Sequence, residues 1–382
     1  MNLFNLYIYP YYFSMNFIGI LRIFYIFKSY LYNFNIDINN SINIVIFVYK
    51  LFFLRIVMFG PSSLQERRRY YREEWSPDNV PNFILDEIIK KEFGFDHNGT
   101  GPNDRYKTFK GPKSLRRFLR AKAPFAAYVS VAYYQEPRRR EGWEKAEYVF
   151  DVDAKDLPIR SCNCDGVCEI CLSEALEIVN NLIDTLKSDL GIKNIHLIYS
   201  GRGYHIRILD PDMVVAGTGL RSEVLKYVAG AEVPKSKFSN PNSINNTYDI
   251  PHFMIPIAYP NVFTQRVKYD VLHLKGSEEI DGINPKLLKD MIKYRGYLNN
   301  DDWGSFKANI GPRRYKDMER GLAKVNLSTI DAKVSIDLKR ILRLPSSLHS
   351  KVSMKCVEVK NRENFDPLKE AVPKFVYERK DS

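Results

Sequence analysis

The chain has 382 residues, 45% of them hydrophobic and 27% charged, which is a globular composition with length for one large or two ordinary domains. Its formal net charge of +12 points to polyanionic partners, although simple solubility explains the same excess. Four of the five cysteines lie within residues 162–171, and this clustering excludes a disulfide framework spread over a secreted domain.

Residues 1–57 form an atypical apolar extension that carries few charges and is rich in Phe, Tyr, Ile and Asn. The run from Phe4 to Phe27 is long enough to cross a bilayer, which needs about 20 residues, so one interpretation is a membrane anchor. The composition changes sharply at residues 58–61, and no small-residue cleavage site follows the apolar stretch. We therefore favour the alternative, an upstream region translated from a misplaced start, with Met58 as the true initiator.

The segment after residue 58 is charged and predicts a succession of helices and strands. Residues 65–75 indicate a short basic helix, and the apolar stripe of residues 82–93 is more typical of a core face than of a cofactor site. The further elements expected before residue 148 are a loop at 96–112, a basic helix at 113–122, a strand at 126–134 and a turn at 137–142. The arginine runs at Arg67–Arg69, Arg116–Arg120 and Arg138–Arg140 suit either phosphate contacts or solvated surface.

Two carboxylates, Asp151 and Asp153, lie at the end of the run of residues 148–153. Aromatic and β-branched residues precede Asp151, so the run predicts a strand. Residues two apart share one face of a strand, which places the two carboxylates side by side. Their mutual repulsion is relieved by a divalent cation that prefers oxygen ligands. The pair therefore indicates a magnesium-type site, although a strand end running into solvent would give the same pattern.

Four cysteines follow the aspartate strand in the pattern C-x-C-x3-C-x2-C: Cys162, Cys164, Cys168 and Cys171. Four thiolates on one short segment can close a tetrahedral shell, which is the signature of structural zinc. A closed shell leaves no position for a reactive water, so we expect no catalytic role here. Iron–sulfur ligation uses the same ligands and is the alternative. A helix is predicted next, over residues 172–190.

A glycine turn joins two further predicted strands, at residues 195–199 and 205–209. Its two glycines allow a sharp turn and a close approach of the backbone to a ligand. Ser200, Arg202 and His205 could converge there on phosphate oxygens, because arginine offers a planar fork and histidine an N–H donor. An ordinary glycine hairpin with a half-buried histidine is the alternative interpretation.

Residues 211–326 contain many Asn, Gly, Pro and Lys residues and predict loops and short helices. Residues 334–338 predict another strand, which carries Asp337 as either a third metal ligand or a capping aspartate. Cationic residues follow closely: Arg340, Arg343, His349 and Lys351. Several cations beside a carboxylate suit a site where a triphosphate and metal ions meet.

Helices and strands alternate irregularly and without an internal repeat, which predicts a mixed α+β core that carries insertions. The combined motifs resemble the small catalytic subunit of the archaeal and eukaryotic type of DNA primase. The resemblance extends over about Met58 to Cys356 and keeps the order and spacing of the motifs. They are residues 70–75, 92–95, 148–153 with the cysteine cluster after them, 200–205 and 336–351.

This resemblance implies an α+β fold with an RRM-like mixed sheet. The implied divisions are a primase catalytic domain at 58–382, a zinc-binding segment at 160–173 and a variable helical insertion at about 211–326. It also implies that two magnesium or manganese ions are bound by Asp151, Asp153 and Asp337. The residues that it implies for the phosphates of the incoming nucleotide are Ser200, Arg202, His205, Arg343, His349 and Lys351.

The resemblance further implies synthesis of short primers on single-stranded DNA from nucleoside triphosphates in DNA replication, by two-metal nucleotidyl transfer. The implied partner is a primase large subunit with an iron–sulfur cluster, in a heterodimer. We expect a cytoplasmic, nucleoid-associated protein of the archaeal type, without membrane association. Two rival classes remain. A metal-dependent nuclease also needs clustered carboxylates, and a non-catalytic zinc-bearing nucleic-acid binder would contact phosphates with its arginine runs.

Overall fold

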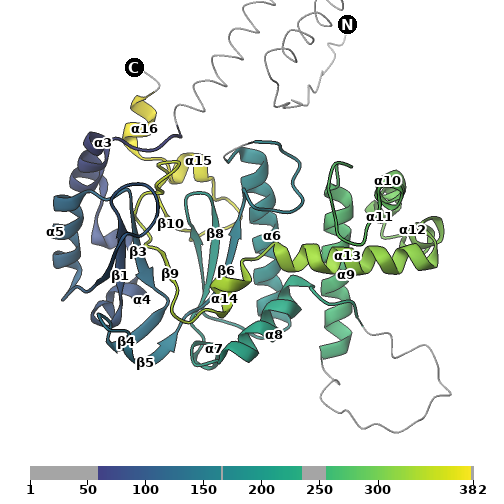
Figure 1. Ribbon diagram of the computed structural model, residues 1–382, viewed down its shortest axis with the longest axis horizontal. Helices are drawn as coiled ribbons and strands as arrows, with labels where there is room; N and C mark the ends of the chain where they lie inside the picture. The colour runs from purple at the N-terminus through teal and green to yellow at the C-terminus, as the bar shows by residue number, and fades with distance from the viewer. Residues whose placement is uncertain (1–58, 165–166, 235–254, 380–382) are drawn as a thin grey trace, which may run out of the picture.

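The computed structural model describes residues 59–164, 167–234 and 255–379, so the predicted extension at 1–57 lies outside the described residues. Two four-stranded antiparallel sheets form the centre of the molecule (Figure 1). The first has the order β2 (Asp104–Lys107), β1 (Phe93–Asp96), β3 (Ala126–Ser130), β9 (Ile341–Arg343). The second has the order β10 (Val357–Glu358), β7 (Ile195–Tyr199), β8 (Gly203–Ile208), β6 (Tyr148–Asp153). A separate hairpin pairs β4 (Ala132–Glu136) with β5 (Glu141–Ala146). This combination of sheets and helices confirms the predicted α+β class.

Helices cover the outer sides of the two sheets (Figure 1). The first sheet is flanked by α3 (Leu64–Arg69), the π-helical turn η1 (Tyr70–Glu74) and α5 (Pro112–Lys122), and the second by α6 (Glu169–Ser188) and α8 (Thr218–Ala229). The short segments are η2 (Pro77–Asn79), α4 (Asn82–Leu85), η3 (Ile88–Lys90), α7 (Pro211–Val214), α14 (Ala332–Ile336), α15 (Pro367–Glu370) and α16 (Lys374–Glu378). The basic helices predicted at 65–75 and 113–122 are thus confirmed.

A helical lobe extends from the sheets beyond α6 (Figure 1). It consists of α9 (Ile255–His273), α10 (Pro285–Tyr294), α11 (Gly296–Asn299), α12 (Trp303–Ile310) and α13 (Pro312–Ser328). The lobe has a core of its own, which includes the buried side chains of Met291, Phe306 and Leu322. Within the described ranges, no helix has both the length and the apolar character needed to cross a bilayer.

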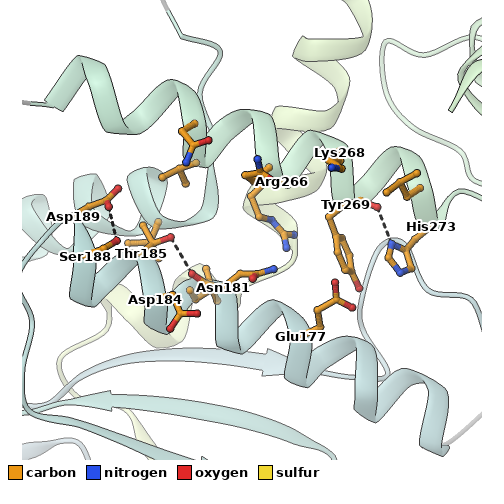
Figure 2. A pocket seen from close by; sticks show the side chains of 16 residues that line it. Glu177, Asn181, Asp184, Thr185, Ser188, Asp189, Arg266, Lys268, Tyr269 and His273 are labelled. Atoms are coloured by element: carbon orange, nitrogen blue, oxygen red, sulfur yellow. Dashed lines mark hydrogen bonds between the residues drawn. The ribbon is translucent and has the colours of Figure 1, made fainter. Parts of the chain in front are cut away.

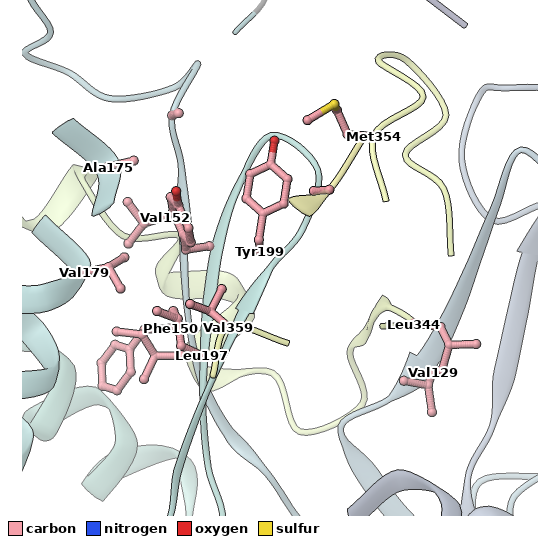
Figure 3. Packing of buried hydrophobic residues seen from close by; sticks show 14 of the residues in the cluster. Val129, Phe150, Val152, Ala175, Val179, Leu197, Tyr199, Leu344, Met354 and Val359 are labelled. Atoms are coloured by element: carbon pink, nitrogen blue, oxygen red, sulfur yellow. The ribbon is translucent and has the colours of Figure 1, made fainter. Parts of the chain in front are cut away.

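The main hydrophobic core packs the second sheet against α6 and continues into the first sheet (Figure 3). Along β6, Phe150 and Val152 are fully buried beside Val179 of α6, whereas Asp151 and Asp153 on the other face are partly exposed. Burial of each such apolar side chain contributes about 1.5–3 kcal/mol. Because side chains alternate along a strand, the core contacts of β6 determine the face on which both carboxylates lie.

The single strand predicted over residues 126–134 is divided into β3 and β4, because the hydrogen-bonding partners of the backbone change at Val131. The Val131 N–H donates to the Arg340 carbonyl at 3.0 Å, and the Val131 carbonyl accepts the Glu147 N–H at 3.0 Å. These bonds to distant segments end β3 and start the β4–β5 hairpin. The stripe predicted at 82–93 has Ile84 and Ile88 in the core as expected, but Ile89 is 61% exposed.

The strand predicted over residues 334–338 is wrong, because this segment is the short helix α14. The carboxylate of Asp331 accepts the backbone N–H groups of Lys333 at 2.9 Å and Val334 at 3.4 Å. Such an N-cap is worth about 1 kcal/mol and outweighs the weak strand preference of the β-branched residues. Asp337 therefore follows the end of a helix instead of lying on a strand.

The prediction of loops and only short helices over 211–326 is also wrong. Helices α8, α9 and α13 have 12, 19 and 17 residues. The residues that suggested loops stand at helix ends: Gly230 is the left-handed C-cap of α8, Asn284 is the N-cap of α10, and Pro312 begins α13. Glycine is favoured at a left-handed C-cap, asparagine at an N-cap and proline in the first turn, so these residues mark the ends of helices and do not prevent helices from forming.

Candidate active site

The two aspartates of β6 face the glycine turn that joins β7 and β8. In the antiparallel register, Asp151 lies directly opposite His205 and Asp153 opposite Gly203. A Cβ atom at Gly203 would stand 2.2 Å from the carbonyl oxygen of Val152, so only glycine allows this close pairing. The predicted carboxylate pair and the predicted phosphate-binding turn are therefore brought together.

Asp153 forms an ion pair with Arg202 from the glycine turn. The Arg202 Nε atom lies 3.0 Å and 2.9 Å from the two carboxylate oxygens, and one terminal nitrogen also donates to Asp153. Burial opposes the charge of the guanidinium, but the hydrogen bond to Asp153 outweighs it and raises the pKa of Arg202. A divalent cation at this carboxylate would therefore share or displace the arginine.

Asp151 has the most perturbed carboxyl group of the site. Burial, followed by the negative charges of Asp153 and Asp331, raises the pKa of Asp151 to about 7, while Arg340 and Arg343 act in the opposite direction. Its Oδ1 atom lies 3.5 Å from Nε2 of His205. A carboxyl group whose pKa is raised by burial and by a second carboxylate beside it is a candidate functional group.

Asp331, which no sequence motif indicated, is a further carboxylate near Asp151. Its N–H donates to the Asp151 carbonyl oxygen at 3.0 Å, and its charge contributes to the raised pKa of Asp151. Asp337 instead accepts the Lys339 N–H at 2.8 Å, and its charge acts on the buried Tyr134. Aspartate is favoured at helix N-caps, but no helix was predicted at this place, so no signal in the sequence singled out Asp331.

The two predicted histidines are both buried, and their pKa values are both lowered well below the ordinary value. For His205 the causes are burial and then the charges of Arg207 and Arg343; for His349 they are burial and then nearby cations, Arg343 foremost. Gly201 has a φ of 101°, and a Cβ there would lie 2.6 Å from Cβ of His349. The glycine thus admits the second histidine to the site, and both rings are neutral at pH 7.

The remaining predicted residues surround these histidines. Arg343, at the end of β9, has its guanidinium 5.2 Å from the ring centroid of Tyr128. The backbone N–H of Lys351 donates to Nδ1 of His349 at 3.2 Å. Ser200 is 9% exposed, and its N–H donates to the Gly203 carbonyl at 2.8 Å. Cationic and neutral hydrogen-bond donors therefore lie together on the side of the site opposite the carboxylates.

The four predicted cysteines form the one group of three or more metal-ligating side chains, among the described residues, whose ligand atoms lie within 4.8 Å of one another. The Sγ separations are 3.6 Å for Cys162–Cys164 and 3.8 Å for both Cys164–Cys171 and Cys168–Cys171. Four sulfurs at about 2.3 Å from a tetrahedral zinc ion stand about 3.8 Å apart. The cluster thus fits a metal such as zinc, and it lies at the start of α6.

A groove of about 450 Å³ lies between α6 and α9 (Figure 2). Polar side chains from both helices line it, including Asn181, Thr185 and Arg266. None of the predicted site residues lines this groove, so it is separate from the carboxylate site.

Comparison with known proteins agrees with this geometry. The model of the DNA primase small subunit family matches residues 150–360, which include the carboxylate pair, the cysteines and the glycine turn. The chain is 70% identical over 322 residues to the DNA primase small subunit PriS of Methanobrevibacter smithii, covering 84% of this chain and 99% of the relative. The corresponding protein of Methanothermobacter thermautotrophicus is 55% identical with the same coverage, and that of Pyrococcus furiosus is 37% identical over 323 residues, covering 81% and 92%. The chain therefore belongs to the DNA primase small subunit family, of the archaeal type.

Proposed function

We propose that this chain is the catalytic subunit of a DNA primase that makes short primers on single-stranded DNA from nucleoside triphosphates by two-metal nucleotidyl transfer. The observation that carries the proposal is the carboxylate pair of Asp151 and Asp153, which faces the glycine turn with its cation Arg202. Family membership supports the same function, because the relatives are named DNA primase small subunits.

The proposed roles follow from charge and donor geometry. Magnesium or manganese ions held by the carboxylates would lower the pKa of the attacking 3′-hydroxyl and offset charge on the transferred phosphate. Arg343 and Lys351 attract and orient the triphosphate by their fixed charge. Neutral His205 and His349 each offer one N–H donor to a phosphate oxygen, and the Ser200 hydroxyl offers another. These donors are preorganised by the buried glycine turn.

For the third carboxylate we propose Asp331 in place of Asp337. Two contacts support this choice: Asp331 adds negative charge around Asp151, and its backbone N–H donates a hydrogen bond to the Asp151 carbonyl oxygen. Asp331 also lies 3.9 Å from the guanidinium of Arg340, so the cationic segment begins beside it. Asp337 interacts with Lys339 and with the surroundings of Tyr134, which gives it a structural role.

Incubation of the protein with labelled nucleotides and a single-stranded template tests the proposed function. We expect new short chains that depend on Mg²⁺ or Mn²⁺. Shortened template would favour a nuclease, and tight binding without incorporation would favour a non-catalytic binder. The same assay with and without a large subunit that carries an iron–sulfur cluster tests the proposed heterodimer, and a chain that begins at Met58 tests residues 1–57. We place this activity in the cytoplasm, at the nucleoid.

The affinity for Mn²⁺ should depend on pH near neutrality. Because the pKa of Asp151 is raised to about 7, protons compete with the cation below this pH, and affinity should fall by up to about tenfold per pH unit. Above pH 7 the carboxylate is ionised and affinity should level off. Calorimetric titration of Mn²⁺ between pH 5.5 and 8.5 measures this directly, and a flat profile contradicts the assignment of Asp151 as a ligand.

Loss of one cysteine should release the structural zinc. We expect Cys171→Ser to lower zinc content from about one ion per chain to near zero and to lower the melting temperature, because three ligands do not close the shell. Lys275 donates to Asn163 at 2.8 Å beside the cluster, so the contact with the helical lobe should also loosen. The matched control is Cys356→Ser, a buried thiol outside the cluster, which should keep its zinc. Iron and visible absorbance in the purified protein would contradict zinc.

A further inference from the structure

One face of the first sheet connects the candidate active site to the outer edge of that sheet. Arg343 on β9, Tyr128 on β3 and Gly94 on β1 are successive partners in the antiparallel register, and such partners share a face. Gly94 itself has no side chain on this face, and its neighbours cover the position. A Cβ there would stand 2.9 Å from Cδ1 of Ile341 on β9, 3.5 Å from Cβ of Pro102 and 3.6 Å from Cγ of Arg105 on β2. At about 4.8 Å per strand, the face from β9 to β2 spans about 14 Å.

Tyr106 and Arg140, at the outer end of this face, both have left-handed backbone conformations. Their φ values are 63° and 58°, which residues other than glycine adopt only at a cost in free energy. The buried carboxylate of Glu92 holds both: it accepts from Arg140 Nε at 2.7 Å and from the Tyr106 N–H at 3.4 Å. It also accepts from Arg105 Nε at 3.0 Å. One buried anion thus fixes two strained backbone positions and two arginines.

The result of this arrangement is a tyrosine ring presented to solvent among cations. Tyr106 is 50% exposed, and its ring centroid lies 4.9 Å from the Arg140 guanidinium and 5.6 Å from that of Arg105. The next residues of the β4–β5 hairpin tip, Arg138 and Arg139, are exposed as well. Proteins that bind single-stranded nucleic acids combine exposed aromatic rings with nearby cations. The bases stack on the rings, and the phosphates lie near the arginines.

We propose that Tyr106 is a stacking platform for a base of the single-stranded template, and that the sheet face from Arg343 to Arg105 is the path of the strand between platform and active site. The inference rests on the proposed function and deepens it. Glu92 is the positioning residue of the platform. At the rise of about 3.4 Å per nucleotide found in a duplex strand, the path holds about four nucleotides.

The test measures binding of a fluorescein-labelled poly-dT oligonucleotide to the full chain by anisotropy. Tyr106→Asn removes the ring, and asparagine tolerates the left-handed backbone, so the fold is kept. We expect a loss of affinity on the order of tenfold for Tyr106→Asn and near-wild-type affinity for Tyr106→Phe, which keeps the ring. The matched control is Tyr297→Asn in the helical lobe, since Tyr297 is 40% exposed and far along the chain from this sheet.

Two further readouts separate stacking from charge. A series of oligonucleotides carries a single abasic site, each at a different position. The wild type should bind one member of the series less tightly than the others, because the base that stacks on Tyr106 is missing from it. In Tyr106→Asn this difference should disappear. The salt dependence of binding should stay unchanged in Tyr106→Asn but lose about one unit of slope in Arg139→Ala. Unchanged affinity and an unchanged abasic profile in Tyr106→Asn would refute the platform. Absence of primer synthesis by the wild type would refute the proposed function. The binding measurements would still decide whether Tyr106 stacks on a base.

Discussion

Asp151→Asn should reduce primer synthesis by at least on the order of 10²–10³-fold, while the protein stays folded and keeps its zinc. Asparagine has the shape of aspartate but no charge, so it binds divalent cations poorly without disturbing the packing of β6. The core residues on the other face of this strand, such as Phe150 and Val152, are unaffected by the change. Incorporation of labelled nucleotides measures the effect, and melting temperature and zinc content report on the fold.

The same assay distinguishes the two candidates for the third carboxylate. Asp331→Asn should lose activity to a similar degree, because asparagine still caps α14 but no longer carries the negative charge beside Asp151. Asp337→Asn is the matched control: asparagine can still accept the Lys339 N–H, and we expect activity within about twofold of the wild type. Substantial loss in Asp337→Asn with full activity in Asp331→Asn would reverse the assignment. Residual synthesis above a few per cent in Asp151→Asn would contradict the site itself.

The parts of the site that the sequence predicted depend on short-range rules. The strand that carries Asp151 and Asp153 was predictable because the three residues before Asp151 are all aromatic or β-branched. The cysteine cluster was predictable because all four ligands lie within ten positions of one another. The glycine turn was predictable because Gly201 and Gly203 have no other common explanation between two apolar runs. In each case the information lies within a few residues.

The parts that were missed depend on contacts between distant segments. Residues 334–338 were predicted as a strand because of their composition, and composition does not show that Asp331 caps a helix there. The break at Val131 depends on hydrogen bonds to Arg340 and Glu147. Nothing near Val131 in the sequence signals either partner, so local preference gave one long strand instead of two.

A buried ion cluster around Glu147 should be the most sensitive point of the fold. Glu147, Lys91 and Arg207 are all fully buried; Lys91 Nζ lies 2.6 Å and Arg207 Nη1 3.2 Å from its carboxylate oxygens. Glu147→Gln leaves two cations in the interior without their anion, and we expect unfolding to become easier by about 3–5 kcal/mol. Urea unfolding followed by circular dichroism measures this difference.

The control for this prediction is Glu144→Gln on β5, three residues before Glu147. Glu144 pairs with Lys90 at 2.9 Å at the surface, where ion pairs contribute little, so the midpoint of unfolding should not move. The double variant Glu147→Gln with Lys91→Met should recover part of the loss, because it removes one of the two stranded charges. Equal effects of Glu144→Gln and Glu147→Gln would show that burial of the cluster has no energetic consequence.

The pH dependence of this defect identifies Lys91 as its main source. Burial, opposed by Glu147, lowers the pKa of Lys91 to about 8, below its value of 10.5 in the unfolded chain. Between these values the unfolded chain binds more protons, so the contribution of Lys91 to stability rises with pH from about 8 to 10.5. Without Glu147 the pKa of Lys91 falls further. The free energy of unfolding then begins to rise at a lower pH, and its total increase is larger. The difference in unfolding free energy between Glu147→Gln and the wild type should therefore shrink from pH 7 to pH 10, whereas a defect that arose only from Arg207 would stay constant.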